Sequence, residues 1–339
     1  MKARACFLAL LAPLLPSQAI EISLVYQNPS DPFFTMAAQQ TMQKAAADVS
    51  YAITTSLSGL SQDVFAGTNG STTATVDWML SYTNPIDGTS VVTLPTFSFL
   101  PDEIVFYVGS RGIAGSTLGL GGAGGAGFGL AASGASSEWT GAVDAMEAAS
   151  NSAMVRGGPV LNAISGSAAL GGTTATYNLQ LGYTVGSLAI NSSADWNLEY
   201  GSLPGAGEND LYSVAVHEML HGIGFGVGQT WNEHVSNWNW DGEAVIALLG
   251  SGTNVLSGDR DHIAEGLTGT PLVDGVWKVG VSQEALMDPT IVLGTRKYIT
   301  DLDLAFLRDM GWETQVVPEP AAALLVLGGT ALLVRRRRS

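Results

Sequence analysis

The sequence SVAVHEMLHGIGF, residues 213–225, determines how the rest of the chain is interpreted. We expect a helix here that begins near Asn209 or Asp210, because either side chain can accept hydrogen bonds from the exposed backbone N–H groups of a first turn. Residues four apart on a helix project from one face, so the imidazoles of His217 and His221 can reach one tetrahedral zinc ion at about 2.0–2.1 Å. The stretch therefore predicts a zinc site on a helix.

Glu218 gives this expected zinc site a chemical function. It lies beside the first histidine and can point at a metal-bound water without binding the metal. Zinc lowers the pKa of bound water towards about 7, and a neighbouring carboxylate can take the proton and later deliver it to a leaving amine. We therefore expect a zinc metalloendopeptidase with Glu218 as general base. Two interpretations compete with it: histidines that only pack on a helix face, and a zinc site that has lost catalysis.

The motif resembles that of the metzincin clan of zinc peptidases. The resemblance rests on His217-Glu218-x-x-His221-x-x-Gly224 and on the sequence LMDP at 286–289, which is similar to a Met-turn containing Met287. It covers residues 186–312. It implies an α+β, zincin-like catalytic domain with a mixed twisted sheet, an active-site helix, a Met-turn beneath the metal and a C-terminal helix. Gly224 would let the chain leave the helix sharply, since glycine accepts positive φ.

The third metal ligand departs from the usual metzincin pattern. Val227 stands at the position of that ligand, and valine cannot bind metal. Leishmanolysin-like metzincins insert residues before the last histidine, and this resemblance implies that His262 completes the zinc site. A thermolysin-like arrangement, with Glu243 or Glu265 as ligand, is the alternative.

The segment between Gly224 and His262 has the character of an insertion. His234, the remaining histidine, is interpreted as a residue of this segment and not as a ligand. Trp231, Trp238 and Trp240 are expected to pack in a core, with a sugar-stacking patch as the alternative. The loop at 259–261, with Asp259 and Asp261, could bind calcium, although it lacks the spaced oxygen pattern of a defined calcium loop.

The rest of the body has the patterns of a single α+β domain over residues 20–314. Strands are expected at 21–27, 73–81, 90–97, 103–108, 174–181 and 185–191, and helices at 32–52 and 138–150. Residues 109–134 are dominated by Gly, Ala and Ser and are expected to form a long surface loop. Thr300-Asp301-Leu302-Asp303 predicts a capping box at the start of a helix with an apolar stripe.

Both ends of the chain are interpreted as targeting signals. Residues 1–19 have a basic start, an apolar stretch and small residues at the cleavage position, which predicts a secretory signal peptide cut by signal peptidase. Residues 315–339 contain Pro-Glu-Pro, an apolar segment and four arginines, and they resemble a PEP-CTERM sorting tail. That resemblance implies an exosortase-type partner, transient membrane contact through the tail, and a final location in the envelope, surface or matrix of a Gram-negative cell.

Charge and cysteine content exclude several classes of function. Residues 20–314 hold 8 basic and 29 acidic side chains, a formal charge of −21, which disfavours nucleic acid and anionic membrane as partners. The only cysteine, Cys6, lies in the predicted signal peptide, so we expect no disulfide and no thiolate ligand in the mature chain. The expected partner is a protein or peptide substrate. A non-catalytic envelope or matrix protein that retains the zinc-peptidase fold is the alternative function.

Overall fold

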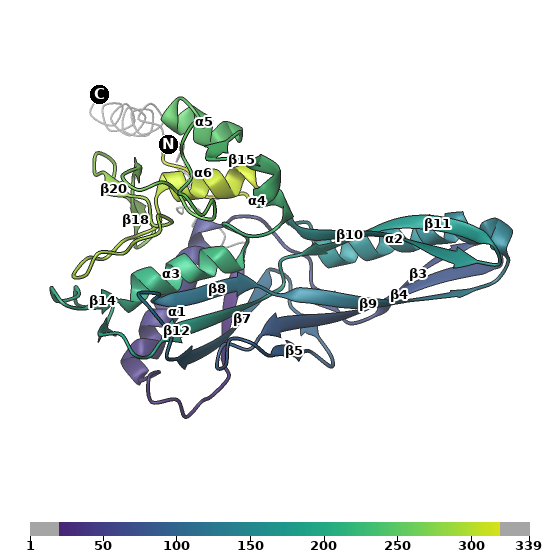
Figure 1. The fold of residues 1–339 in the computed structure, drawn as a ribbon, viewed down its shortest axis with the longest axis horizontal. Helices are drawn as coiled ribbons and strands as arrows, with labels where there is room; N and C mark the ends of the chain where they lie inside the picture. The colour runs from purple at the N-terminus through teal and green to yellow at the C-terminus, as the bar shows by residue number, and fades with distance from the viewer. Residues whose placement is uncertain (1–19, 319–339) are drawn as a thin grey trace, which may run out of the picture.

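The computed structural model describes residues 20–318 (Figure 1). The predicted signal peptide and the sorting tail beyond Pro318 lie outside the described residues. Helices and strands alternate irregularly along the chain and the strands form several sheets. The predicted α+β class is therefore confirmed.

A four-stranded sheet supports the candidate site. Its order is β1 (Glu21–Tyr26), β7 (Glu103–Arg111), β12 (Val185–Asn191) and β8 (Gly119–Ala123). The strands β1, β7 and β12 are parallel, whereas β8 is antiparallel to β12 and forms one edge of the sheet. The sheet is mixed, as predicted.

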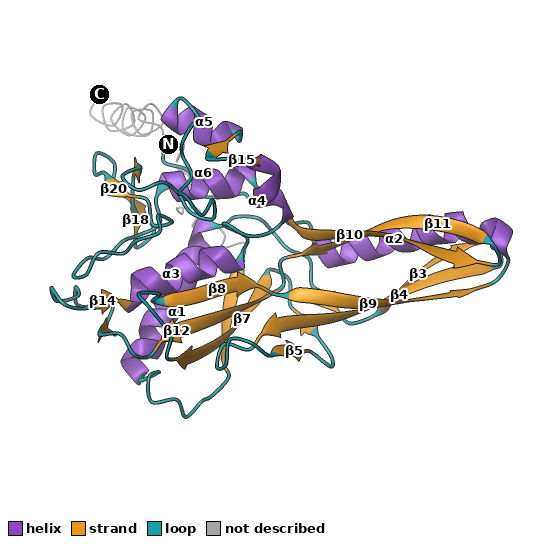
Figure 2. Cartoon of the chain, in the orientation of Figure 1, coloured by secondary structure: helices purple, strands orange, loops and turns teal. Residues whose placement is uncertain are grey.

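Two helices, α1 (Met36–Ala52) and α3 (Leu211–Gly222), pack against each other and against this sheet (Figure 2). The helix α1 starts after the predicted Pro32, because the Thr35 side chain is the N-cap and accepts from the backbone N–H of Ala38. The α3 helix starts where the sequence predicted, with Asp210 as N-cap.

The C-terminal helix α6 (Asp301–Asp309) also begins as predicted. Thr300 and Asp303 form a capping box, in which each side chain accepts from the backbone N–H of the other residue. Leu302, Leu304, Phe306 and Leu307 are buried, so α6 contributes to the same core as α1 and α3.

An elongated arm extends from the central sheet (Figure 1). One of its layers is a sheet of β3 (Val64–Asn69), β4 (Thr72–Thr83), β5 (Val91–Thr93) and β9 (Gly125–Ser133). The other layer is the hairpin of β10 (Val160–Leu170) and β11 (Thr173–Gly182). The helix α2 (Trp139–Val155) contacts β3, β4 and β11 and therefore lies between the two layers.

The predicted surface loop at residues 109–134 is wrong. β7 runs on to Arg111, β8 and β9 occupy most of the remainder, and β9 pairs with β4 along its whole length. Glycine content argued against strands, but β propensity depends on how a residue fits its neighbours. The predicted strand at 90–97 is also shorter, since only residues 91–93 pair with β4.

The remaining elements are short and connect these layers. They are β2 (Leu60–Ser61), β6 (Ser98–Phe99), the 3-10 helix η1 (Ser136–Glu138), β13 (Trp196–Asn197), β14 (Asn209–Asp210), α4 (Gln229–His234), β15 (Val235–Ser236), β16 (Asn239–Trp240), α5 (Glu243–Leu249), β17 (Thr268–Gly269), β18 (Leu272–Val273), β19 (Val276–Trp277) and β20 (Gln283–Glu284).

The buried side chains form two hydrophobic clusters. The larger one joins the central sheet to α1, α3 and α6, and the smaller one fills the arm around Trp78 and Trp139. Leu161 packs against both clusters and marks their junction. Within residues 20–318, no helix has the length and apolar character needed to cross a membrane.

Candidate metal centre

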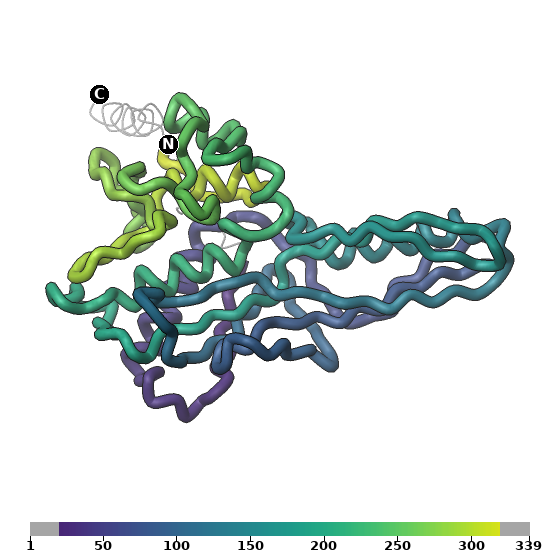
Figure 3. The backbone as a smooth tube through the Cα atoms, viewed as in Figure 1, coloured from purple at the N-terminus to yellow at the C-terminus, as the bar shows by residue number. Residues whose placement is uncertain are grey.

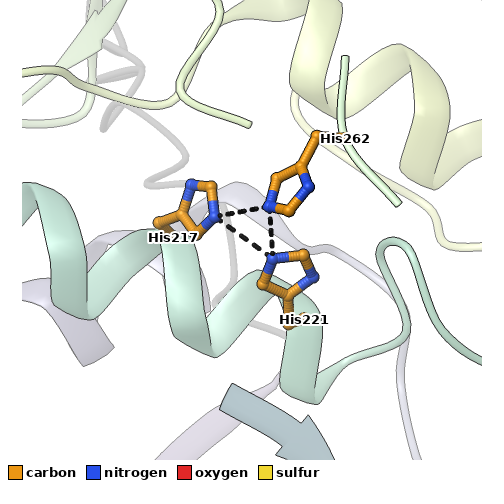
Figure 4. A group of neighbouring side chains, drawn as sticks. All are labelled: His217, His221 and His262. Carbon is orange, nitrogen blue, oxygen red and sulfur yellow. Dashed lines mark hydrogen bonds between the residues drawn. The ribbon is translucent and has the colours of Figure 1, made fainter. Parts of the chain in front are cut away.

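Three histidine rings converge above the C-terminal half of α3 (Figure 4). His217 and His221 extend from consecutive turns of the helix, and His262 reaches them from a loop more than forty residues further along the chain. The Nε2 atoms of His217 and His221 lie 3.1 Å apart, and each lies 3.2 Å from the Nε2 atom of His262. One atom placed among them could contact all three nitrogens.

The outer nitrogen of each ring has its own acceptor. His217 Nδ1 lies 3.0 Å from the carbonyl oxygen of Leu286, and His221 Nδ1 lies 2.7 Å from that of Phe225. His262 Nδ1 lies 2.9 Å from a carboxylate oxygen of Asp259. Because a carbonyl oxygen can only accept, the Nδ1 atoms of His217 and His221 carry the protons, and their Nε2 lone pairs point inward.

This arrangement fits a divalent cation bound by imidazoles. Three inward lone pairs repel one another unless a cation or proton lies between them, and burial works against a proton. Desolvation lowers the pKa of His217 well below its usual value and that of His221 to about 4, with the neighbouring histidine charges adding to the effect. Ligands about 2.0–2.1 Å from a tetrahedral zinc ion lie about 3.3 Å from each other, close to the separations seen here.

Glu218 is buried at the edge of the central sheet. One of its carboxylate oxygens accepts a hydrogen bond from the backbone N–H of Gly121 in β8, at 2.5 Å. Burial raises the pKa of Glu218 to about 7, and the Gly121 hydrogen bond only partly offsets this rise. A carboxyl group with this pKa can exchange a proton near neutral pH, as a general base must.

Two glycines of β8 allow α3 to approach the sheet this closely. A Cβ atom on Gly121 would lie 2.0 Å from the backbone oxygen of Glu218, and one on Gly119 would lie 2.7 Å from the Glu218 Cγ atom. Any larger residue at Gly121 would therefore separate the helix from the strand. The glycines of GLGGAG at 119–124 are the sequence signal for this contact, although such a composition by itself favours a loop.

The segment around Met287 ties the metal centre to α6. Leu286 supplies the carbonyl that orients His217, and the Met287 carbonyl accepts from the backbone N–H of Ile263, next to His262. The backbone N–H groups of Leu286 and Met287 donate to the two carboxylate oxygens of Asp303, which is fully buried. Sequence reasoning missed Asp303, because its capping role in α6 already accounted for it.

The other ligand candidates lie elsewhere. Glu243 begins α5 and does not join the histidine cluster. Glu265 clusters with Glu284 and Asp288, where the Lys297 ammonium contacts both Glu284 and Asp288 and supplies a positive charge. Val227, as expected, supplies no ligand atom.

His234 is also separate from the metal centre. Its Nδ1 atom lies 2.6 Å from an Asp241 carboxylate oxygen, and its Nε2 atom lies 2.8 Å from the carbonyl oxygen of Asp309. Nearby, Trp231 and Trp240 are buried against each other and against Phe306, so the predicted core role of these two tryptophans is confirmed. Trp238 differs, because it is 49% exposed.

The loop proposed for calcium has another use in the structure. Asp259 accepts hydrogen bonds from the Ser257 hydroxyl, the Asp261 backbone N–H and the His262 ring. Its carboxylate therefore orients His262. The sequence signal for this role was the position of Asp259 three residues before a candidate ligand.

Comparisons of the chain with protein-family models, with curated proteins and with solved structures found no match. The function of the chain is therefore inferred from the residues of the site itself.

Proposed function

We propose that this protein is a zinc-dependent endopeptidase of metzincin type, with His217, His221 and His262 as metal ligands. The convergence of their three Nε2 atoms, beside the buried carboxylate of Glu218, is the observation that supports this proposal. Zinc, when bound, would supply the Lewis acid that acidifies a water molecule and polarises the scissile carbonyl. The mixed sheet with an antiparallel edge strand, the helix bearing the motif and the segment at Met287 are consistent with the same family.

The chemical role of Glu218 follows from its position one residue after His217. Its carboxylate takes the proton from the attacking water and passes it to the nitrogen of the leaving group. The peptide bond therefore breaks to release a neutral amine and not a high-energy nitrogen anion. The raised pKa of Glu218 suits both halves of this transfer. The outer hydrogen bonds of the three histidines hold their rings in place throughout.

Among the described strands β8 pairs only with β12, so its other edge is the surface that suits an extended substrate. Gly121 donates its N–H to Glu218, so this backbone group points away from β12 and towards the site. An extended peptide can pair through its own backbone groups with the groups of this edge that Glu218 does not occupy. We infer that the substrate binds along β8, with its scissile bond beside Glu218.

A zinc-binding envelope or matrix protein without catalysis is the alternative. The hydrogen bond from Gly121 to Glu218 is the observation that favours it, because it would also suit a glutamate that only fastens α3 to β8. A purely structural zinc site, however, needs no carboxylate beside its ligands. The two functions differ in whether the zinc-loaded protein cleaves peptide bonds, and in whether that cleavage needs the Glu218 carboxylate.

The deciding experiment measures zinc content and proteolysis of the purified protein with and without a chelator. We expect about one zinc per chain and cleavage of an unfolded protein substrate that the chelator abolishes. The Glu218→Gln variant should keep its zinc and lose cleavage. Zinc binding without cleavage in the wild type would support the non-catalytic alternative, and undiminished cleavage by Glu218→Gln would overturn the assigned mechanism.

A further inference from the structure

The strands β8 and β9 form one continuous ribbon that joins the central sheet to the arm (Figures 1 and 3). Only Gly124 separates them. A Cβ atom on Gly124 would lie 2.7 Å from the backbone oxygen of Ser81 in β4 and 2.9 Å from that of Val185 in β12. Along one edge the ribbon therefore pairs first with β12 and then with β4. Its other edge continues from the candidate site into the arm.

A cavity of about 570 Å³ lies beside this joint. Its walls come from the start of β9, from β10 and from α4, and they include Ala126, Asn162, Asn232 and Glu233. The cavity adjoins the β8 edge, because its lining includes Gly124 and Gly125, which directly follow the strand that contacts Glu218. A strand that leaves the β8 edge at Gly124 would enter it.

The strands on either side of the cavity each have one edge that pairs with no other described strand. Among the described strands, β9 pairs only with β4 and β10 pairs only with β11. Residues 112–137 and 157–194, which include β8 to β12 apart from α2, contain no charged side chain and no histidine. Lysines, prolines and bulges block many such edges. Pro159 precedes β10 and its register shifts between Val160 and Asn162, whereas β9 has no proline and pairs in continuous register, so β9 offers the more open template for another strand.

We propose that this cavity, which we call the arm groove, binds a second part of the extended polypeptide substrate, beyond the residues that pair with β8. The substrate is then a long, unfolded segment of protein, recognised mainly through its backbone, and not a short peptide. Continuity with the β8 edge favours substrate over a second copy of this chain as the occupant. This inference rests on the proposed function, because it takes the β8 edge as the substrate site.

The lack of charge along the groove strands also limits what the substrate can be. A groove without basic residues offers no partner for acidic peptides, and Glu233 at its rim disfavours them further. Ala126, Leu161 and Ile164 supply apolar surface instead. The expected substrate segment is therefore not acidic and has small or apolar side chains where it contacts the groove.

The test compares two peptides and two tryptophan variants. A quenched peptide of about six residues spans about 20 Å and covers only the β8 edge, whereas one of about sixteen residues spans about 50 Å and reaches the groove. Asn162→Trp fills the groove from an exposed position on β10. Ser167→Trp, exposed on the same strand but outside the cavity lining, is the matched control.

We expect Asn162→Trp to lower kcat/KM for the long peptide about tenfold, a loss of about 1.4 kcal/mol, and to leave the short peptide unchanged. Ser167→Trp should behave as the wild type with both peptides. An Asn162→Trp variant that cleaves the long peptide as well as the control would overturn the inference while leaving the proposed function intact. If the wild type cleaves neither peptide, the proposed function fails instead.

A binding measurement keeps the inference testable without catalysis. Fluorescence anisotropy of the labelled long peptide is measured with Glu218→Gln protein and with the Glu218→Gln/Asn162→Trp double variant. About tenfold weaker binding by the double variant supports the groove. Equal binding overturns it, as does a concentration-dependent dimer of the wild type that Asn162→Trp abolishes, because the occupant would then be a second copy.

Discussion

At the scale of single residues, the candidate centre depends on the groups that orient the histidines as much as on the histidines. Two of the three outer acceptors are backbone carbonyls, at Leu286 and Phe225, which substitution of a side chain cannot remove. Asp259 is the exception, since it holds His262 through a carboxylate. It is therefore the one orienting group that mutagenesis can test directly.

Asp259→Asn should weaken zinc binding about 10- to 100-fold, as is common when a carboxylate partner of a metal-bound histidine is lost. Asp261→Asn is the matched control, because Asp261 is acidic and exposed in the same loop and contributes its backbone N–H, not its carboxylate, to Asp259. Competition with a chromogenic chelator measures both affinities. Equal losses in the two variants would mean that the loop acts through its net charge and not through the hydrogen bond to His262.

His262→Ala should weaken zinc binding by orders of magnitude, because it removes one of three ligands. His234→Ala should keep the zinc affinity and instead lower the free energy of unfolding by about 0.5–1.5 kcal/mol, mainly through the lost hydrogen bond to the Asp309 carbonyl, because Asp241 is exposed to water. Metal analysis and urea denaturation separate the two effects. A loss of zinc from His234→Ala alone would contradict the ligand assignment.

Because the pKa of Glu218 is raised, we expect a pH-dependent difference in stability between the metal-free wild type and the metal-free Glu218→Gln variant. Burial raises the folded-state pKa of Glu218 from 4.5 to about 7, so the folded protein holds this proton at a pH where the unfolded chain has lost it. The contribution of protonated Glu218 to the free energy of unfolding is therefore fully present below about pH 4.5 and is lost as pH rises through about 7.

The glutamine of the Glu218→Gln variant does not titrate in this pH interval. Relative to that variant, the free energy of unfolding of the wild type should fall by up to about 3 kcal/mol across the interval. The histidines are the same in both proteins, so their titration cancels. Urea denaturation from pH 4.5 to 8 checks the prediction. A difference that stays constant with pH would show that Glu218 is not desolvated in the metal-free protein.

At the scale of elements, the contact between α3 and β8 decides whether the motif reaches the sheet edge. Gly121→Ala would place a methyl group 2.0 Å from the Glu218 backbone oxygen, so helix and strand must move apart. Gly122→Ala, one residue on, meets no atom within 4 Å. These neighbours therefore form a matched pair with the same chemical change.

We expect Gly121→Ala to lower the free energy of unfolding by about 1–3 kcal/mol, as overpacking commonly does, and to reduce peptide cleavage. Gly122→Ala should change stability by less than about 0.5 kcal/mol. Thermal unfolding and the short-peptide assay measure both effects. Equal behaviour of the two variants would contradict the close packing of α3 on β8.

At the scale of the whole molecule, two hydrophobic clusters meet at a junction that contains the buried guanidinium of Arg156. Its three nitrogens donate to the carbonyls of Ser58, Leu100 and Glu103, so one side chain fastens α2 to the chain that enters the central sheet. The arm is thus held to the site-bearing part by specific hydrogen bonds as well as by Leu161. This is consistent with a groove that spans both parts.

The exported protein should lack residues 1–19 and most of the sequence after Pro318. Both ends are interpreted as export and sorting signals, which are removed by cleavage. Intact-mass measurement of the exported form decides this. Recovery of the four terminal arginines on the exported protein would show that the tail serves as an anchor instead.

Sequence alone was sufficient for features that depend on local geometry. The helical period places His217 and His221 on one face, and short polar side chains cap α1, α3 and α6 close to where the pattern predicted. These predictions need only neighbours within a few residues. The strands β1, β7 and β12 were likewise predicted one by one from local patterns of apolar residues, whereas their pairing in one sheet joins distant parts of the chain and was not predicted.

Only the tertiary structure decided what lies around that helix. The sequence predicted His262 as the third ligand through a family resemblance, with Glu243 or Glu265 as the alternative, because ligands are chosen by position in space and loop closure costs little more for a long loop than for a short one. Folding brings the His262 ring to the α3 histidines and uses Glu265 elsewhere. The glycines at 119–125 were ambiguous for the same reason: their role depends on α3, β4 and β12, which approach them from distant parts of the chain.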